Sequence, residues 1–154
     1  MRFQVNVEGW GAWTAYATIK TDLDISGAGD GLKKIYVEYK DNAGNTATAV
    51  HDSTILDRIA PAPVSLALAG SGGYTNNATP AISVNATSAD SMSYELDAGG
   101  WSAYEAYSAA KSGFSISAGG DGLKRVYAKF RDLAGNESNG ALYDSTNYDT
   151  TPPS

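Results

Sequence analysis

An internal repeat constrains the fold of this 154-residue chain more than any other feature. GDGLKKIYVEYKDNAGN at residues 29–45 returns as GDGLKRVYAKFRDLAGN at residues 120–136, an offset of 91. The same offset runs back without a gap to Met1 against Met92, and 19 positions of residues 1–45 are identical in the two copies. One inserted residue then changes the offset to 92. Self-similarity over this length predicts that one structural unit occurs twice.

The two copies differ in length, which sets the expected domain boundaries. Residues 1–57 are expected to form an incomplete unit, residues 58–149 a complete unit, and residues 150–154 the start of a further junction. The first copy has no counterpart of the two alternating segments Val64–Leu68 and Ile82–Ala86. Half of an apolar core buries too little surface to be stable alone. We therefore expect the first unit to be completed from outside these residues, either by preceding strands or by another chain.

Period-two alternation predicts most of the secondary structure. Apolar residues alternate with polar or small ones in five segments of the complete copy, which are residues 64–68, 82–86, 92–96, 114–116 and 126–130. In the first copy Ile35, Val37 and Tyr39 are expected to face inward together. Glycine-rich clusters separate the segments, as turns require. About seven short strands in about 90 residues predict an all-β fold, an antiparallel immunoglobulin-like β-sandwich, with one complete and one N-terminally truncated repeat in tandem.

One segment leaves two structures open. Trp101, Tyr104 and Tyr107 are three residues apart, and the intervening residues include good helix formers. A single helical turn fits this spacing. We favour a short irregular strand that closes a hairpin with the preceding strand, because a helix of this length is unstable alone.

These motifs resemble a known family. WSAYEAY at residues 101–107, GDGLKRVYAKFRDLAGN and the junction DRIAPAP at residues 57–63 are similar to the bacterial immunoglobulin-like repeats that occur in tandem in large surface and secreted proteins. The resemblance covers essentially the whole chain. It implies a β-sandwich of about 90 residues in an extracellular setting, in some members with calcium at the domain junctions. The first copy departs from the pattern because it lacks two strands.

Charge and residue types exclude several functional classes. The net charge of −6 argues against nucleic acid as a partner, because binding to phosphates needs Lys and Arg. Apolar runs long enough to insert into a membrane do not occur in the sequence. Nucleophilic catalysis needs a base beside Ser or Thr, but the one histidine, His51, is replaced by Tyr143 in the complete copy. We therefore predict that the chain is not an enzyme.

Two aromatic rows are the candidate ligand-binding residues. They consist of Trp10, Trp13 and Tyr16 in the first copy and Trp101, Tyr104 and Tyr107 in the second. Flat apolar ring faces are suited to stacking against a sugar. Large aromatic side chains also dominate the energetics of cores, so packing is the favoured interpretation and a glycan platform the alternative.

Four aspartates are the candidate metal ligands, and calcium is the one candidate cofactor. Asp41 and Asp132 begin the two DxAGN turns. The same residue types are also typical of a tight hairpin turn that binds no metal. Asp57 and Asp149 begin the proline-containing junctions. Calcium requires six to eight oxygen ligands, so each aspartate needs help from another loop. Tight turns and stiff spacers are therefore the favoured interpretation.

Together these observations predict a non-catalytic structural or adhesive module, a segment of a tandem immunoglobulin-like stalk or fibre outside the cell or at its surface. The expected partners are neighbouring repeats of the same array or another copy of the chain. A glycan or a protein of a host or cell surface is a further possible partner. Two alternatives remain, a carbohydrate-binding module that uses the aromatic rows and a filament subunit that exchanges strands.

Overall fold

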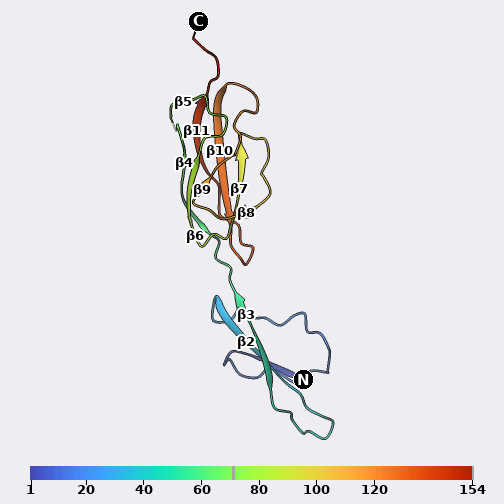
Figure 1. Ribbon diagram of the computed structural model, residues 1–154. Helices are drawn as coiled ribbons and strands as arrows, with labels where there is room; N and C mark the ends of the chain where they lie inside the picture. Colours follow the sequence, from blue (N-terminus) through green and yellow to red (C-terminus); the bar gives the residue numbers. More distant parts are fainter. Residues whose placement is uncertain (71, 154) are drawn as a thin grey trace. The chain divides into compact units, whose positions relative to one another are not determined.

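The computed structural model describes residues 1–70 and 72–153 and is built from strands (Figure 1). The chain divides into two compact units, unit 1 (Met1–Arg58) and unit 2 (Ile59–Ser154). Among the described residues, none forms a helix that is long and apolar enough to cross a membrane. All the elements of the described chain are strands, so the fold is all-β.

Unit 1 contains one antiparallel sheet of three strands in the order β1-β2-β3. The strands are β1 (Arg2–Val5), β2 (Gly31–Glu38) and β3 (Val50–Leu56). The hairpin between β2 and β3 turns at Asp41–Asn45, where Gly44 adopts a φ of 94°. Glycine adopts this left-handed conformation without the steric cost that a side chain brings.

Unit 2 contains two sheets, consistent with a β-sandwich. The larger sheet has the order β5-β11-β10-β7-β8 and the smaller one β4-β6-β9. Their strands are β4 (Ala62–Leu68), β5 (Tyr74–Thr75), β6 (Ile82–Thr87), β7 (Ser91–Leu96), β8 (Glu105–Ala106), β9 (Ala110–Lys111), β10 (Gly122–Arg131) and β11 (Leu142–Tyr148). Neighbouring strands are antiparallel, except that β5 runs parallel to β11.

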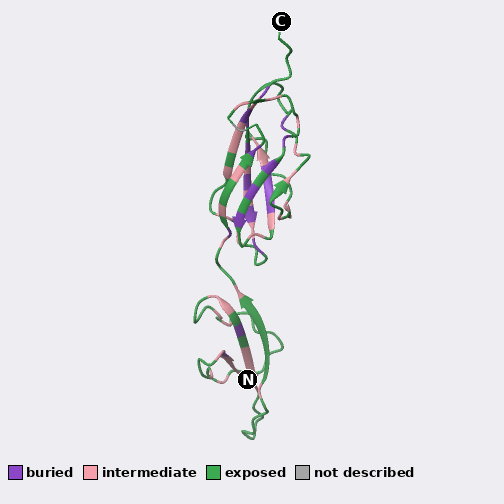
Figure 2. Cartoon of the chain, turned by 60° about the vertical axis from the view of Figure 1, so that its left-hand side comes forward, coloured by how far each residue is buried: buried purple, intermediate pink, exposed green. Residues whose placement is uncertain are grey.

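The core of unit 2 combines residues from both sheets (Figure 2). Ile82 and Val84 of the smaller sheet and Val126, Ala128 and Phe130 of the larger one are all buried. This alternation confirms the sequence prediction for both segments. Burial also raises the pKa of Tyr94 to about 12, because the charged phenolate is disfavoured away from water.

The three strands of unit 1 pair in the same register as three strands of unit 2. Phe3 lies opposite Val37 in β1 and β2, and the residues 91 positions later, Tyr94 and Ala128, lie opposite each other in β7 and β10. The pairing of β2 with β3 matches that of β10 with β11 in the same way, with an offset of 92 for the second strand. The inserted residue therefore changes the offset of the sequence repeat and the offset between paired strands by the same one residue.

Two details of unit 2 correct the sequence-based expectations. Val64 is 55% exposed, because the register with β6 shifts between Pro63 and Ser65 and this irregularity moves Val64 out of the alternation. Residues 114–116 are not a strand, although Ile116 is buried and Phe114 packs on the core. The amide of Ile116 instead donates to the carbonyl of Ala78 at 2.8 Å.

The aromatic segment of unit 2 is extended, as favoured from the sequence. β8 pairs with β7, with Glu105 opposite Met92 and Ala106 opposite Ser91. No helical turn is present between residues 101 and 111, all of which are described. The short strand therefore closes a hairpin with the preceding strand, and the helical alternative is wrong.

Candidate functional site

The aromatic row of unit 2 lies beside cationic side chains of β10. Lys129 Nζ is 4.9 Å from the ring centroid of Trp101 and 5.3 Å from that of Tyr104, and Arg131 Cζ is 4.1 Å from that of Tyr104. Both cations also pair with Glu137, and the Arg131 hydrogen bond lowers the pKa of that carboxyl. Cations at this distance are attracted to a ring face, so these faces already have an intramolecular partner.

Tyr107, the third aromatic residue of the row, belongs to the core. Its ring meets Phe130 edge to face, with centroids 6.1 Å apart, and its hydroxyl accepts a hydrogen bond from the Ala86 amide at 3.2 Å. Trp101 is more open, with 38% of its surface exposed. The row therefore passes from an exposed end at Trp101 to a partly buried end at Tyr107.

The aromatic row of unit 1 also lies beside cations, although only Lys40 is the counterpart of a unit 2 cation, Arg131, and Arg2 belongs to β1. Arg2 Cζ lies 5.0 Å from the Trp10 ring and 4.6 Å from the Trp13 ring, and Lys40 Nζ lies 4.5 Å from Trp13. Tyr16 contacts Tyr39 with ring centroids 6.1 Å apart, as Tyr107 contacts Phe130. Tyr16 is nevertheless 71% exposed. The two rows therefore differ in exposure at the end that is partly buried and packed on the core in unit 2.

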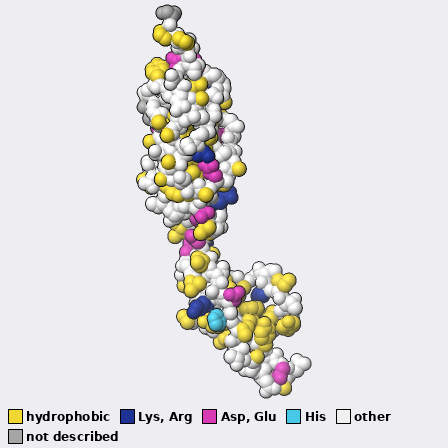
Figure 3. Space-filling model, viewed as in Figure 1, with side chains coloured by type: hydrophobic (Ala, Val, Ile, Leu, Met, Phe, Trp, Pro, Cys, Tyr) yellow, Lys and Arg dark blue, Asp and Glu magenta, His cyan; other side chains and the backbone are white. Residues whose placement is uncertain are grey.

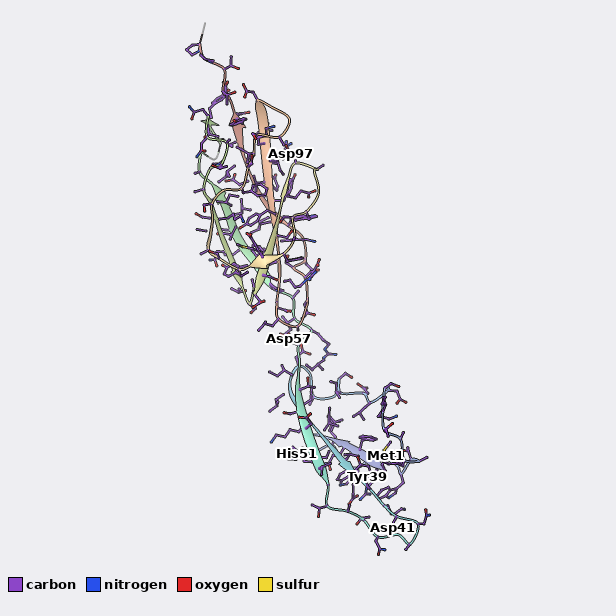
Figure 4. The ribbon with its side chains drawn as sticks, turned by 45° about the vertical axis from the view of Figure 1, so that its right-hand side comes forward. Met1, Tyr39, Asp41, His51, Asp57 and Asp97 are labelled. Atoms are coloured by element: carbon purple, nitrogen blue, oxygen red, sulfur yellow. The ribbon has the colours of Figure 1, made fainter. Side chains whose placement is uncertain are left out.

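A hollow of about 440 Å³ opens at this end of unit 1. Its lining includes Met1, Trp13, Tyr16, Tyr39 and Asp41. Figure 4 shows Met1 and Tyr39 close together, with Asp41 in the loop beyond β2. Three aromatic side chains beside a lysine and an aspartate make this hollow the main candidate for an interaction site in unit 1.

Asp41 and Asp132 stabilise equivalent turns. The Asn45 backbone amide donates to Asp41 Oδ1 at 2.8 Å, and its side-chain amide donates to Oδ2 at 2.9 Å. Asn136 makes the same two bonds to Asp132, each at 2.9 Å. The side-chain amide bonds are the main reason why the pKa of both carboxyls is held below its usual value. Both oxygens of each carboxylate therefore take part in the turn.

The other two candidate metal ligands do not join these turns. Asp57 directly follows β3, and Asp149 follows β11, where Oδ1 accepts the Thr151 amide at 2.9 Å. Across residues 1–70 and 72–153, the structure brings together no group of three or more His, Cys, Asp or Glu side chains suited to hold a metal ion. The four aspartates thus do not converge on one site within the described chain.

Two further aspartates hold the chain where it leaves each unit, and sequence reasoning did not single them out. Asp30 accepts the Arg58 amide at 2.8 Å and the Arg58 Nε at 2.7 Å. Asp121, 91 residues later, accepts the Thr150 amide at 3.1 Å and the Thr150 and Thr151 hydroxyls at 2.8 and 2.9 Å. We call Asp30 and Asp121 the exit aspartates. Their signal in the sequence is the repeated GDGLK motif.

Two lysines in the same motif are buried, which the alternation pattern did not predict. Lys33 and Lys124 are almost fully enclosed, and their amino groups donate to the carbonyls of Gly27 and Ala118. A buried ammonium group needs such partners, because its desolvation is costly. Each lysine thereby ties the preceding loop to the start of β2 or β10.

No protein-family model matches the chain, and a search of curated proteins finds no match.

Proposed function

We propose that the chain is a non-catalytic spacer, a segment of a tandem immunoglobulin-like stalk or fibre that works outside the cell or at its surface. The main support is the shared register of β1-β2-β3 and β7-β10-β11, in which each pairing recurs at the offset of the sequence repeat. A repeated sequence that keeps its register is typical of modules joined end to end. On this proposal unit 1 is an incomplete copy of unit 2.

The exit aspartates supply the mechanical part of this proposal. Each binds the first residues after the last strand of its unit, so the departing chain is tied to the unit itself. Pro61 then restricts the backbone of the connecting segment. A tied exit followed by a restricted backbone favours a stiff connection between modules, which a spacer needs.

The single histidine supports a structural role. The ring of His51 lies 5.1 Å from that of Tyr36 across β2 and β3, and Tyr127 and Tyr143 form the equivalent pair at 5.3 Å in unit 2. Cross-strand aromatic pairs of this kind stabilise a sheet. His51 thus occupies a position that tyrosine holds in unit 2, and a cross-strand packing role accounts for it in the non-catalytic proposal.

A distance measurement between equivalent positions tests the proposed stiffness. The chain contains no cysteine, so Asn42→Cys and Leu133→Cys, which lie at the same place in the two hairpin turns, accept spin labels selectively. We expect a single narrow distance distribution, and Asp30→Ala should broaden it. Asp121→Ala is the matched control, because it releases only the chain beyond unit 2 and should leave the distribution unchanged. A broad distribution in the native chain would contradict a stiff spacer.

A carbohydrate-binding module is the second candidate, favoured by the partly exposed Trp101 and by the aromatic hollow of unit 1. It ranks second because cations already lie against Trp10, Trp13 and Tyr104. A glycan array separates the two candidates. Binding that is lost in Trp101→Ala or Tyr16→Ala, without loss of folding, would support the carbohydrate-binding function.

A further inference from the structure

Unit 1 has the counterpart of only one half of the core that is found in unit 2. Many core positions of unit 2 have apolar counterparts in unit 1. We call six of these counterparts the open face: Tyr16, Ile35, Val37, Tyr39, Val50 and Leu56. In unit 2 the position of Tyr39 is taken by Phe130, which is fully buried, whereas Tyr39 is 39% exposed. Figure 3 shows hydrophobic side chains gathered at the surface of the unit that carries the histidine.

Unit 2 shows what covers the equivalent face there. β4 and β6 supply Leu68, Ile82 and Val84, and the Ala86 amide of β6 bonds to the Tyr107 hydroxyl. Residues 1–58 are all described, and none of them forms a strand in the place of β4 or β6. Tyr16, which lines the hollow, is the counterpart of Tyr107, which bonds to β6 in unit 2.

The outer edge of β3 carries the polar groups that such a covering segment uses. In unit 2 the Asp144 carboxylate accepts the Leu68 amide at 2.8 Å, the Thr146 hydroxyl donates to the Gly70 carbonyl at 2.9 Å, and the Ser145 carbonyl accepts the Gly72 amide at 3.1 Å. The counterparts in β3 are Asp52, Ser53 and Thr54, with identical side chains. β3 is an edge strand of its sheet. An unpaired edge is a template for a further strand.

We propose that the open face and the outer edge of β3 are a docking surface for a polypeptide segment with the chemistry of residues 62–87. The segment presents apolar side chains at every second position of its second strand. It bonds to Asp52 through a backbone amide at the end of its first strand and to Thr54 through a glycine-rich turn. It also adds a short strand parallel to β3, as β5 does to β11. Strand addition of this kind combines backbone hydrogen bonds with pockets for alternate side chains. This proposal rests on the proposed function, because it treats unit 1 as an incomplete copy of unit 2.

The test uses the full 154-residue chain and a synthetic peptide of residues 59–90. Hydrogen exchange is followed at residues 50–56 of β3 and, as an internal reference, at residues 142–148 of β11. With free peptide at ten times its dissociation constant, we expect protection in β3 to rise about tenfold, with no change in β11. A peptide carrying Val84→Asp is the matched control and should have no effect. Asp52→Ala with Thr54→Val in the chain should weaken binding without lowering the melting temperature of unit 2.

A second variant tests the proposal without relying on the solubility of the peptide. Residues 59–91 fused directly before Met1 recreate the sequence context of Met92, and should raise the protection of residues 31–38 to that of residues 122–129. Failure of both the peptide and the fusion overturns the proposal. It is also overturned if the native monomer already protects β3 as well as β11, or if a glycan or a second copy of the chain occupies the open face instead. A narrow distribution of spin-label distances, without binding of the peptide or folding of the fusion, would still support the spacer function and would contradict only the docking surface.

Discussion

Phe130 and Tyr39 occupy the same place in the repeat, yet Phe130 is fully buried and Tyr39 is 39% exposed. Phe130 belongs to β10, and Tyr39 directly follows β2. β10 pairs with β11 in the same register as β2 with β3, and the turns that follow have the same hydrogen bonds. The comparison separates two levels of structure. Strand pairing and turns recur wherever the sequence is repeated, whereas burial depends on a second layer that unit 1 does not contain within its described residues.

The largest expected difference between the units concerns the core. Phe130→Ala should lower the free energy of unfolding of unit 2 by about 3–5 kcal/mol, the usual cost of removing a buried large aromatic. Tyr39→Ala should cost unit 1 less than about 1 kcal/mol, because the side chain is partly exposed. Urea titrations read from the amide signals of each unit measure both values. Equal losses would contradict the contrast between a covered and an open face.

Trp101→Ala should have an intermediate effect. Packing of a fully buried ring would predict about 3–5 kcal/mol, but the 38% exposure of Trp101 lowers our expectation to about 2 kcal/mol. Lys129→Met keeps the aliphatic stem and removes the charge near the ring, so it should cost only about 0.5–1 kcal/mol. Chemical denaturation measures both variants. A loss below about 1 kcal/mol for Trp101→Ala would argue against packing and for a ligand-binding ring.

Acid should affect the two hairpin turns alike. Hydrogen bonds from asparagine lower the pKa of Asp41 and Asp132 in the folded protein. Because the folded pKa is depressed, the stabilisation is complete above about pH 4, the unfolded value, and is lost as pH falls through the folded pKa. Asp41→Asn and Asp132→Asn should each reduce the acid sensitivity of their own unit. Melting curves between pH 6 and pH 2 check this, and a response in only one unit would break the equivalence of the turns.

Calcium should have the smallest effect. The carboxylates of Asp41 and Asp132 bond within their turns, and the four candidate aspartates do not converge among the described residues. We expect little change in the melting temperature of either unit when calcium is replaced by a chelator. A shift above about 10 °C, roughly 2 kcal/mol for a unit of this size, would indicate a calcium site after all.

The sequence predicted the β-rich fold where alternation is regular. Ile82, Val84 and Ala86 are buried as expected, and so are Val126 and Phe130. Val64 is exposed, contrary to the alternation, because the register with β6 is irregular beside it. Such an irregularity depends on the partner strand and is not visible in the sequence of one segment. Phe114 and Ile116 show that alternating burial needs no ladder, since a loop packed on a core produces it too.

The candidate sites were predicted less completely than the fold. The spacing of Trp101, Tyr104 and Tyr107 identified an aromatic row, but not the cations of β10 that lie beside it. Those cations lie on a strand about 25 residues further along the chain, so only the pairing of β7, β8 and β10 brings them together. The role of the exit aspartates could not be predicted for a similar reason, because their hydrogen-bond partners lie 28 to 30 residues away in the sequence.

The exit aspartates matter most when the chain is under tension. A pull on the segment after unit 1 is directed at the end of β3, where Leu56 faces Gly31 and the ladder would otherwise open one pair at a time. The Asp30–Arg58 ion pair lies outside that first pair, so it has to break before the strand peels away. At unit 2 the same position relies on neutral hydroxyl donors. Salt should therefore weaken the resistance to force at the first exit and leave the second nearly unchanged.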